Sequence, residues 1–233
     1  MTNNLKTKLM GSLQAIIAGV DDTVPLEDPL FAVNWFDTKS AWLYFIYNVF
    51  AATSVKAVGG EVVIKGKVTS VLTGDTQDRR DMLLIVRYPS GSRFLQMLRS
   101  RYFQLVSLMR VTAVSRFTFG FTQPTVAKTA KPDADKTMAY SICHFRGADM
   151  SVELTNLASQ HGAVPVYGGK LAARLATQKA GADKVDVPCL MDGTVILQAT
   201  NPDAFKDILS DPGFAAVAEN SEGLFFATFD RLM

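Results

Sequence analysis

The sequence predicts an α+β fold made of two tandem β-α-β-β-α-β units, preceded by an extra N-terminal helix. Two observations support this prediction. The segment FLQMLRSRYF, from Phe94 to Phe103, has the same apolar spacing as FKDILSDPGF, which begins at Phe205. Upstream, GEVVIKG from Gly60 is matched by GAVPVYG from Gly162. An internal repeat of this kind indicates two copies of one structural unit.

The composition is that of a folded protein with a sizeable core. The chain has 233 residues, of which 48% are apolar and 20% charged, which fits two domains of about 100 to 120 residues each. A net charge of +2 is too small to indicate nucleic acid or an anionic membrane as partner. The two cysteines, Cys143 and Cys189, lack any metal-ligand spacing, so we predict no metal site and a cytoplasmic location.

The N-terminal residues predict an amphipathic helix. Residues 9–20 are moderately apolar, but Ser12 and Gln14 interrupt them and no clear cleavage site follows, which argues against a secretory leader. The longest apolar run, residues 41–55, is shorter than the roughly 18 residues of a membrane span and contains Asn48. We therefore expect a buried helix there and no membrane association.

The first unit reads as four strands and two helices. Asp37 and Ser40 are both candidate N-caps for the first helix, which Gly59 ends, and the second strand should bend near Gly66. The second helix should begin at a cap on Ser92. Alternation and β-branched content predict strands over Leu30–Phe36, Glu61–Leu72, Met82–Tyr88 and Val111–Phe121.

The second unit follows a polar linker. Its predicted elements are strands at Tyr140–Phe145, Ala163–Tyr167, Thr194–Thr200 and Leu224–Phe229, and helices at Ser151–Gln160 and after Asn201 and Pro202. The predicted domain boundaries are 1–28 for the N-terminal helix and lead-in, 29–123 for the first repeat, 124–137 for the linker and 138–233 for the second repeat.

These residues also resemble a known family. VGGEVVIKG, RRDMLLIVRYPSGSRFLQML and YFQ followed by Arg110 resemble the family called domain of unknown function thirteen-thirty, in the dimeric α/β-barrel superfamily of ferredoxin-like folds. The resemblance implies two sheets packed face to face, here an intramolecular barrel of the dimeric type. Strand segments apolar on both sides, such as LLIV and TVIL, agree with sheets buried on both faces.

The resemblance places several candidate site residues inside the barrel. Trp35 and His144 take matching positions on the first strand of each copy, and Tyr140 shares the face of His144. Arg87 alternates with apolar residues that point the same way, and a buried arginine needs an anionic partner, either a ligand carboxylate or an internal acid. We predict His144 and Arg87 as catalytic residues, and Trp35, Tyr140 and Arg110 as binding residues.

The function is predicted only by class. We expect a small, partly apolar organic molecule to be bound or transformed between the two sheets, with His144 moving a proton if the protein is an enzyme. By fold analogy such an enzyme would be a cofactor-independent monooxygenase, isomerase or cyclase. No cofactor is predicted, with haem on His144 as an alternative, and His144 could equally be a hydrogen-bonded core residue.

Two other functions remain open. The protein could be a non-catalytic association module with a filled barrel and an apolar exterior patch, and a homodimer is a possible assembly. RNA binding is less favoured: RFTFGF, from Arg116 to Phe121, resembles an RNA-recognition signature but falls on the last strand instead of a central one.

Overall fold

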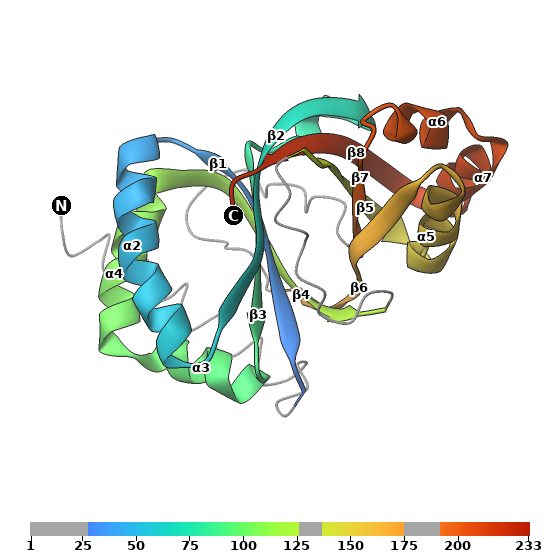
Figure 1. Ribbon diagram of the computed structural model, residues 1–233. Coiled ribbons are helices and arrows are strands. Elements are labelled where there is room, and N and C mark those ends of the chain that lie inside the picture. Colours follow the sequence, from blue (N-terminus) through green and yellow to red (C-terminus); the bar gives the residue numbers. More distant parts are fainter. Residues whose placement is uncertain (1–27, 126–136, 175–191) are drawn as a thin grey trace.

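The computed structural model describes residues 28–125, 137–174 and 192–233 (Figure 1). The order β-α-β-β-α-α-β in the first half recurs in the second, so the fold is α+β. The elements are β1 (Leu30–Thr38), α2 (Ala41–Ala57), β2 (Glu61–Thr73), the 3₁₀ helix η1 (Thr76–Asp78), β3 (Met82–Tyr88), α3 (Gly91–Arg99), α4 (Arg101–Ala113), β4 (Val114–Pro124), β5 (Ala139–Gly147), α5 (Ser151–Gln160), β6 (Ala163–Arg174), β7 (Gly193–Ala199), α6 (Ala204–Ser210), α7 (Pro212–Asn220) and β8 (Ser221–Arg231).

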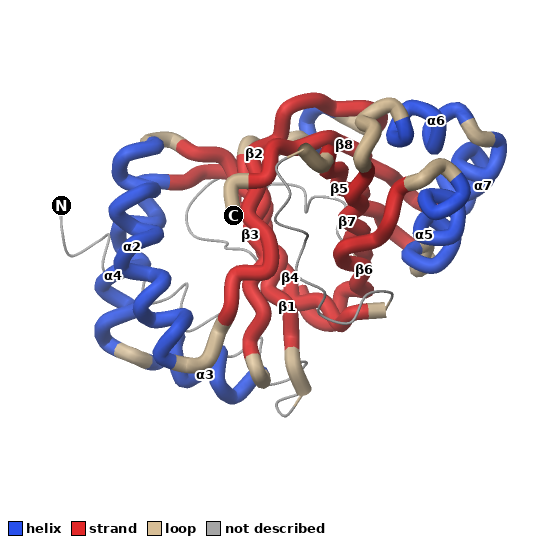
Figure 2. The backbone as a smooth tube through the Cα atoms, in the orientation of Figure 1, coloured by secondary structure: helices blue, strands red, loops and turns tan. Residues whose placement is uncertain are grey.

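The eight strands form one closed antiparallel barrel in the order β1-β3-β2-β8-β5-β7-β6-β4 (Figure 2). In each half the first strand is central, because β1 pairs with β3 and β4 while β5 pairs with β7 and β8. The two halves meet where β2 pairs with β8 and where β4 pairs with β6. The predicted barrel within a single chain is therefore confirmed.

Apolar side chains from both halves fill the barrel. On β3, Leu83 and Ile85 face inward and Val86 faces outward, as strand alternation requires. The ring of Phe31 packs 5.1 Å from that of Tyr167, centroid to centroid, across the two halves. The fully buried interior side chains also include Val33, Trp35, Ile64, Ile142, Ile196, Phe225 and Ala227.

Helices cover the outer face of each half of the barrel (Figure 1). The outer side of the first half packs against α3 and α4, with Phe94 and Phe121 at 4.7 Å between ring centroids. The outer side of the second half packs against α5, α6 and α7, where Phe205 and Phe226 meet. Cys143 belongs to this second layer and faces the helices.

Most strands lie where the sequence predicts them, and β3 and α5 have the predicted bounds. The prediction was wrong at residues 111–113, which form the last turn of α4 and not the start of a strand. Val111 is β-branched, and residues 111–114 contain no glycine, proline or other turn residue that would mark the change from helix to strand. The pattern alone therefore gave no boundary there.

The second helical segment of each half is divided in two. Ser100 and Asp211 have extended backbones and cap the helices that follow them, accepting hydrogen bonds from the backbone N–H of Phe103 and Gly213. Ser90, not the predicted Ser92, caps α3. Of the two candidate caps for α2, Ser40 takes that role.

Some predicted segments lie outside the described residues: the N-terminal helix, most of the linker and Cys189. Within the described ranges, none of the helices combines the length and apolarity that a bilayer crossing requires.

Candidate ligand-binding site

The predicted site residues do not gather in one place. Trp35 and His144 lie together in the barrel core, with ring centroids 4.9 Å apart and the planes at 73°. Tyr140 lies four residues from His144 along β5 and packs on Phe229. Arg87 lies four residues from Leu83, the residue that pairs with Trp35, which is about 13 Å along the strand.

His144 is a neutral core residue in this structure. Its side chain is 0% exposed, and its Nδ1 lies 2.9 Å from Oγ1 of Thr194. Burial lowers its pKa from 6.5 to about 3, because the protonated ring would lose its hydration. Its Nε2 has no hydrogen-bond partner among the described residues. The ring would have to leave this environment to exchange a proton with a substrate or to bind haem.

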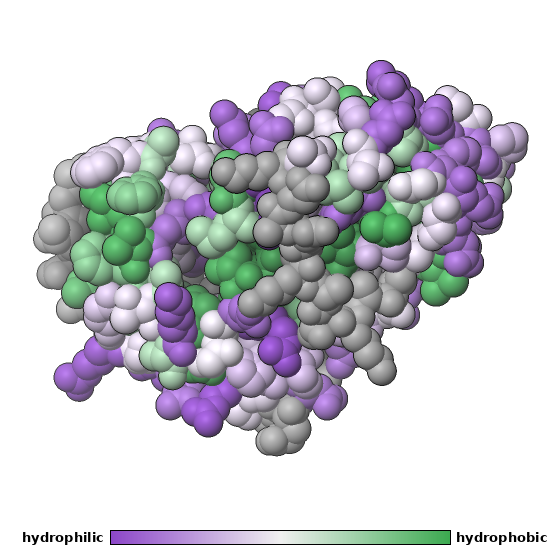
Figure 3. Space-filling model, in the orientation of Figure 1, coloured by the Kyte–Doolittle hydropathy of each residue, from purple (hydrophilic) through white to green (hydrophobic). Residues whose placement is uncertain are grey.

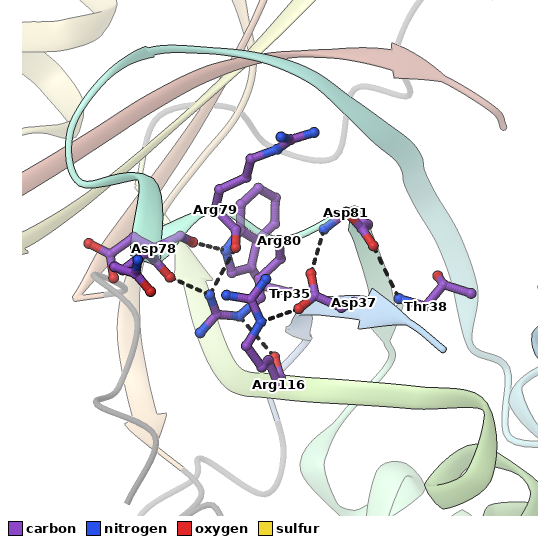
Figure 4. Close-up of polar contacts among 9 residues, drawn as sticks. Trp35, Asp37, Thr38, Asp78, Arg79, Arg80, Asp81 and Arg116 are labelled. Carbon is purple, nitrogen blue, oxygen red and sulfur yellow. Dashed lines mark hydrogen bonds and ion pairs between the residues drawn. The ribbon is translucent and has the colours of Figure 1, made fainter. Parts of the chain in front are cut away.

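The polar end of the barrel is organised around Arg80, which is 3% exposed (Figure 4). Its Nε donates to the carbonyl oxygen of Arg116 at 3.0 Å. Its Nη1 donates to the carbonyl oxygens of Gln77 at 2.7 Å and Arg79 at 2.9 Å. These bonds give most of the N–H donors of the buried guanidinium an acceptor. The sequence analysis did not single out Arg80, because it lies in the polar segment TGDTQDRR between two strands, where charged side chains are usually exposed.

The same network orients Trp35 (Figure 4). The Nε1 of Trp35 donates to the carbonyl oxygen of Asp78 at 2.9 Å. Asp37 accepts a hydrogen bond from the backbone N–H of Asp81 at 3.0 Å and forms an ion pair with Arg116. Arg116 has a φ of 39°, in the left-handed region that few residues other than glycine adopt. The network therefore holds a strained backbone position near the start of β4, two residues from Thr118, which pairs with Trp35.

A cavity of about 440 Å³ lies outside the barrel, between the helices of the first half and the outer face of its strands. Its volume is within the range of roughly 300 to 1,000 Å³ typical of ligand pockets. Its wall is mostly apolar and comes from α2, α3, α4 and the strands beneath them, including Ala51, Val55, Val86, Phe94, Met97 and Phe119. Hydrophobic side chains also gather on the surface over α2 (Figure 3).

A few polar groups interrupt this apolar wall. Arg110, the one predicted binding residue in the cavity wall, stacks with its guanidinium carbon 4.5 Å from the centroid of Phe117. Its Nε is buried and has no hydrogen-bond partner among the described residues. Burial raises the pKa of Tyr47, while Arg110 acts in the opposite direction. Lys65 also lines the cavity, and desolvation lowers its pKa.

A second cavity, of about 620 Å³, lies at the end of β8 and is lined by residues that include Tyr140, Phe229 and Arg231. The guanidinium of Arg231 lies over the ring of Tyr140 and donates to its hydroxyl at 3.3 Å. Tyr140 is thereby engaged within the protein. Neither of these two cavities is lined by His144 or Arg87.

Solved structures share this fold. A protein described as a candidate monooxygenase, from Fusobacterium nucleatum, is 11% identical over 91% of this chain and 94% of its own, with a TM-score of 0.53. An anthrone oxidase-like protein is 12% identical over 90% and 94%, with a TM-score of 0.51. A haem-binding protein from Thermus thermophilus is 14% identical over 91% and 94%, with a TM-score of 0.40.

At these identities the first two likenesses establish the fold alone, that of dimeric α/β-barrel proteins. No family model and no curated protein matches the sequence. The resemblance to the family of unknown function therefore stays a prediction. Among the described residues, no three His, Cys, Asp or Glu side chains lie close enough to hold a metal ion, and haem stays an untested alternative.

Proposed function

We propose that the protein binds a small, mainly apolar organic molecule in the cavity beneath α2, α3 and α4. The observation that carries the proposal is the 440 Å³ apolar cavity itself. A packed interior normally leaves few voids larger than a water molecule, so a cavity of this size indicates a binding site. The location differs from the predicted one between the two sheets, because apolar side chains occupy the barrel interior.

Filling the cavity tests this proposal. Ala51 is buried on α2 and lines the cavity, while Ala57 is exposed on the same helix and does not. Ala51→Phe should reduce binding of N-phenyl-1-naphthylamine, a neutral apolar dye, at least tenfold, because its ring would occupy the space. Ala57→Phe makes the same chemical change and should leave binding unchanged. Fluorescence titration measures both, and equal binding by the two variants would contradict the proposal.

Catalysis is not part of the proposal. His144 and Arg87, the predicted catalytic pair, lie apart, and His144 is fully buried. Binding without chemistry needs only the cavity and its polar groups.

A second candidate function is association of two copies through the outer face of α2 and α4. Trp42 is 67% exposed and Phe45 60% on α2, and Leu105 is 66% exposed on α4. Tyr102 links the helices by donating to the carbonyl oxygen of Phe50 at 3.4 Å, so the apolar residues form one surface. Apolar surface on this scale is typical of an interaction site.

The oligomeric state tests this second candidate. Phe45→Lys should convert a dimer to a monomer, because a charge would be buried at the contact. Sedimentation equilibrium measures the mass of both proteins. If the unmodified protein is a monomer at every concentration, the association function is wrong.

We also propose that the two halves arose by duplication, with the predicted domain boundaries between them. The repeated element order and the equivalent strands that carry Trp35 and His144 support this origin. A duplication leaves each copy free to change, which agrees with a ligand cavity described beneath the helices of the first half.

A further inference from the structure

The cavity wall contains charged side chains, and one of them has a buried donor without a hydrogen-bond partner among the described residues. Arg110 stacks on Phe117 and leaves its buried Nε without a hydrogen-bond partner among the described residues. Lys56 and Lys65 also line the cavity, and Glu61 is the acidic residue that does so. Among the described residues of the wall, positive side chains therefore outnumber negative ones.

An unpartnered buried donor is unfavourable, at about 1 to 3 kcal/mol, until an acceptor reaches it. A planar guanidinium matches a carboxylate in geometry and charge, and such hydrogen bonds are roughly twice as strong as neutral ones. Its stacking on Phe117 limits its freedom to turn away, so it is oriented before a ligand arrives.

The size and polarity of the cavity limit the rest of the ligand. If each non-hydrogen atom takes the ~30 Å³ that a water takes, about 15 such atoms fit in the 440 Å³ cavity. The apolar wall formed by Val86, Phe94 and Met97 suits an alkyl or aryl body. Glu61 would repel a second acid group on the ligand.

We infer that the ligand of this cavity is a monocarboxylate with an apolar body of roughly 10 to 12 carbons, its carboxylate hydrogen-bonded to Arg110. The inference rests on the proposed function, because it names the class of molecule that the cavity binds. Arg110 acts here as a binding residue that selects acids over neutral analogues of the same length.

The test compares dodecanoate with dodecan-1-ol by isothermal titration calorimetry. The unmodified protein should bind the acid about tenfold to a hundredfold more tightly than the alcohol, as a charged hydrogen bond provides. Arg110→Met should abolish this preference for the acid while still binding the alcohol. Arg101→Met, on the exposed side of the same helix, should keep it. Arg110→Gln, which keeps a neutral polar group on a shorter side chain, replaces Arg110→Met if the latter does not fold.

Each outcome decides the inference. If the unmodified protein binds acid and alcohol equally, or binds no dodecanoate, the inference is wrong. It is also wrong if the preference persists without the Arg110 guanidinium. The neutral dye separates this failure from that of the proposed function: dye binding that Ala51→Phe reduces keeps the cavity as a binding site even when the carboxylate preference is absent.

Discussion

Within the part of the chain that the structure describes, the buried cation Arg80 is held by backbone carbonyl groups and not by a hydrogen bond to a carboxylate. Its hydrogen bonds go to three backbone carbonyl oxygens, which belong to Gln77, Arg79 and Arg116. The guanidinium therefore ties the 3₁₀ turn before β3 to the start of β4, two segments far apart in the sequence. Because the carbonyl of Asp78 accepts from Trp35, the same turn also fixes the ring that packs on His144.

Replacing Arg80 should be costly for folding. Arg80→Met leaves three carbonyl groups without their donor, and we expect a loss of about 2 to 4 kcal/mol in the free energy of unfolding. Arg79→Met removes a neighbouring arginine that is exposed and should change stability by less than about 0.5 kcal/mol. Urea denaturation measures both variants, and similar losses would contradict the role of Arg80.

His144 should make stability depend on pH. Its pKa is about 3 in the folded protein and near 6.5 when unfolded, so the unfolded chain binds more protons between these values. Stability is therefore full above pH 6.5 and falls as the pH decreases, by about 2 kcal/mol between pH 7 and pH 5.

His144→Gln keeps a possible hydrogen bond to Thr194 but cannot titrate, and it should remove this dependence. His161→Gln is the control, because His161 is partly exposed and pairs with Asp211. Denaturation at a series of pH values measures the slopes. An unchanged slope in His144→Gln would show that other groups cause it.

At the scale of elements, the contact between β2 and β8 depends on a glycine. A Cβ atom on Gly66 would overlap the ring of Phe229, which lies over the β2 backbone in the barrel interior. Gly66 pairs with Arg231 on β8, and the register between the two strands shifts just beyond Val68. The strand was predicted to bend near Gly66, and at this position the partner strand packs closely on its backbone.

Gly66→Ala should destabilise the protein by about 1 to 3 kcal/mol through this overlap. Shortening the opposing side chain should relieve it, so the double variant Gly66→Ala, Phe229→Leu should lose less than the sum of the two single variants. A double-mutant cycle from urea denaturation gives this coupling energy. Additive losses would mean that the two residues do not meet.

At the scale of the whole molecule, the barrel interior belongs to both halves at once. Trp35 from β1 packs on His144 and Phe225 from the second half. Neither half can lose its structure without exposing side chains that the other buries. The two halves should therefore unfold together, although their helix layers are separate.

Trp35 provides the measurement. The chain has two tryptophans, and Trp42 is largely exposed, so in a Trp42→Phe variant the fluorescence reports the barrel core alone. Its unfolding transition in urea should coincide with that of the far-ultraviolet circular dichroism. Two separated transitions would show that the halves unfold independently.

The sequence predicted strands better than the site, for physical reasons. Residues 82–88 are a largely apolar run that ends at Pro89, so the bounds of β3 could be read directly. The matching positions of Trp35 and His144 on the first strands were predicted from the family resemblance. The cavity could not be predicted from the sequence, because its volume depends on the distance between the helices and the sheet. The burial of Arg80 depends on a partner 36 residues away.

The closed barrel has a consequence for recognition. Each of the eight described strands has a neighbour on both sides, so no strand offers unpaired backbone groups along its edge. Another polypeptide cannot extend this sheet by strand addition, and pairing that leads to fibrils has no template here while the barrel is intact. Any partner of the barrel must therefore be recognised by side chains.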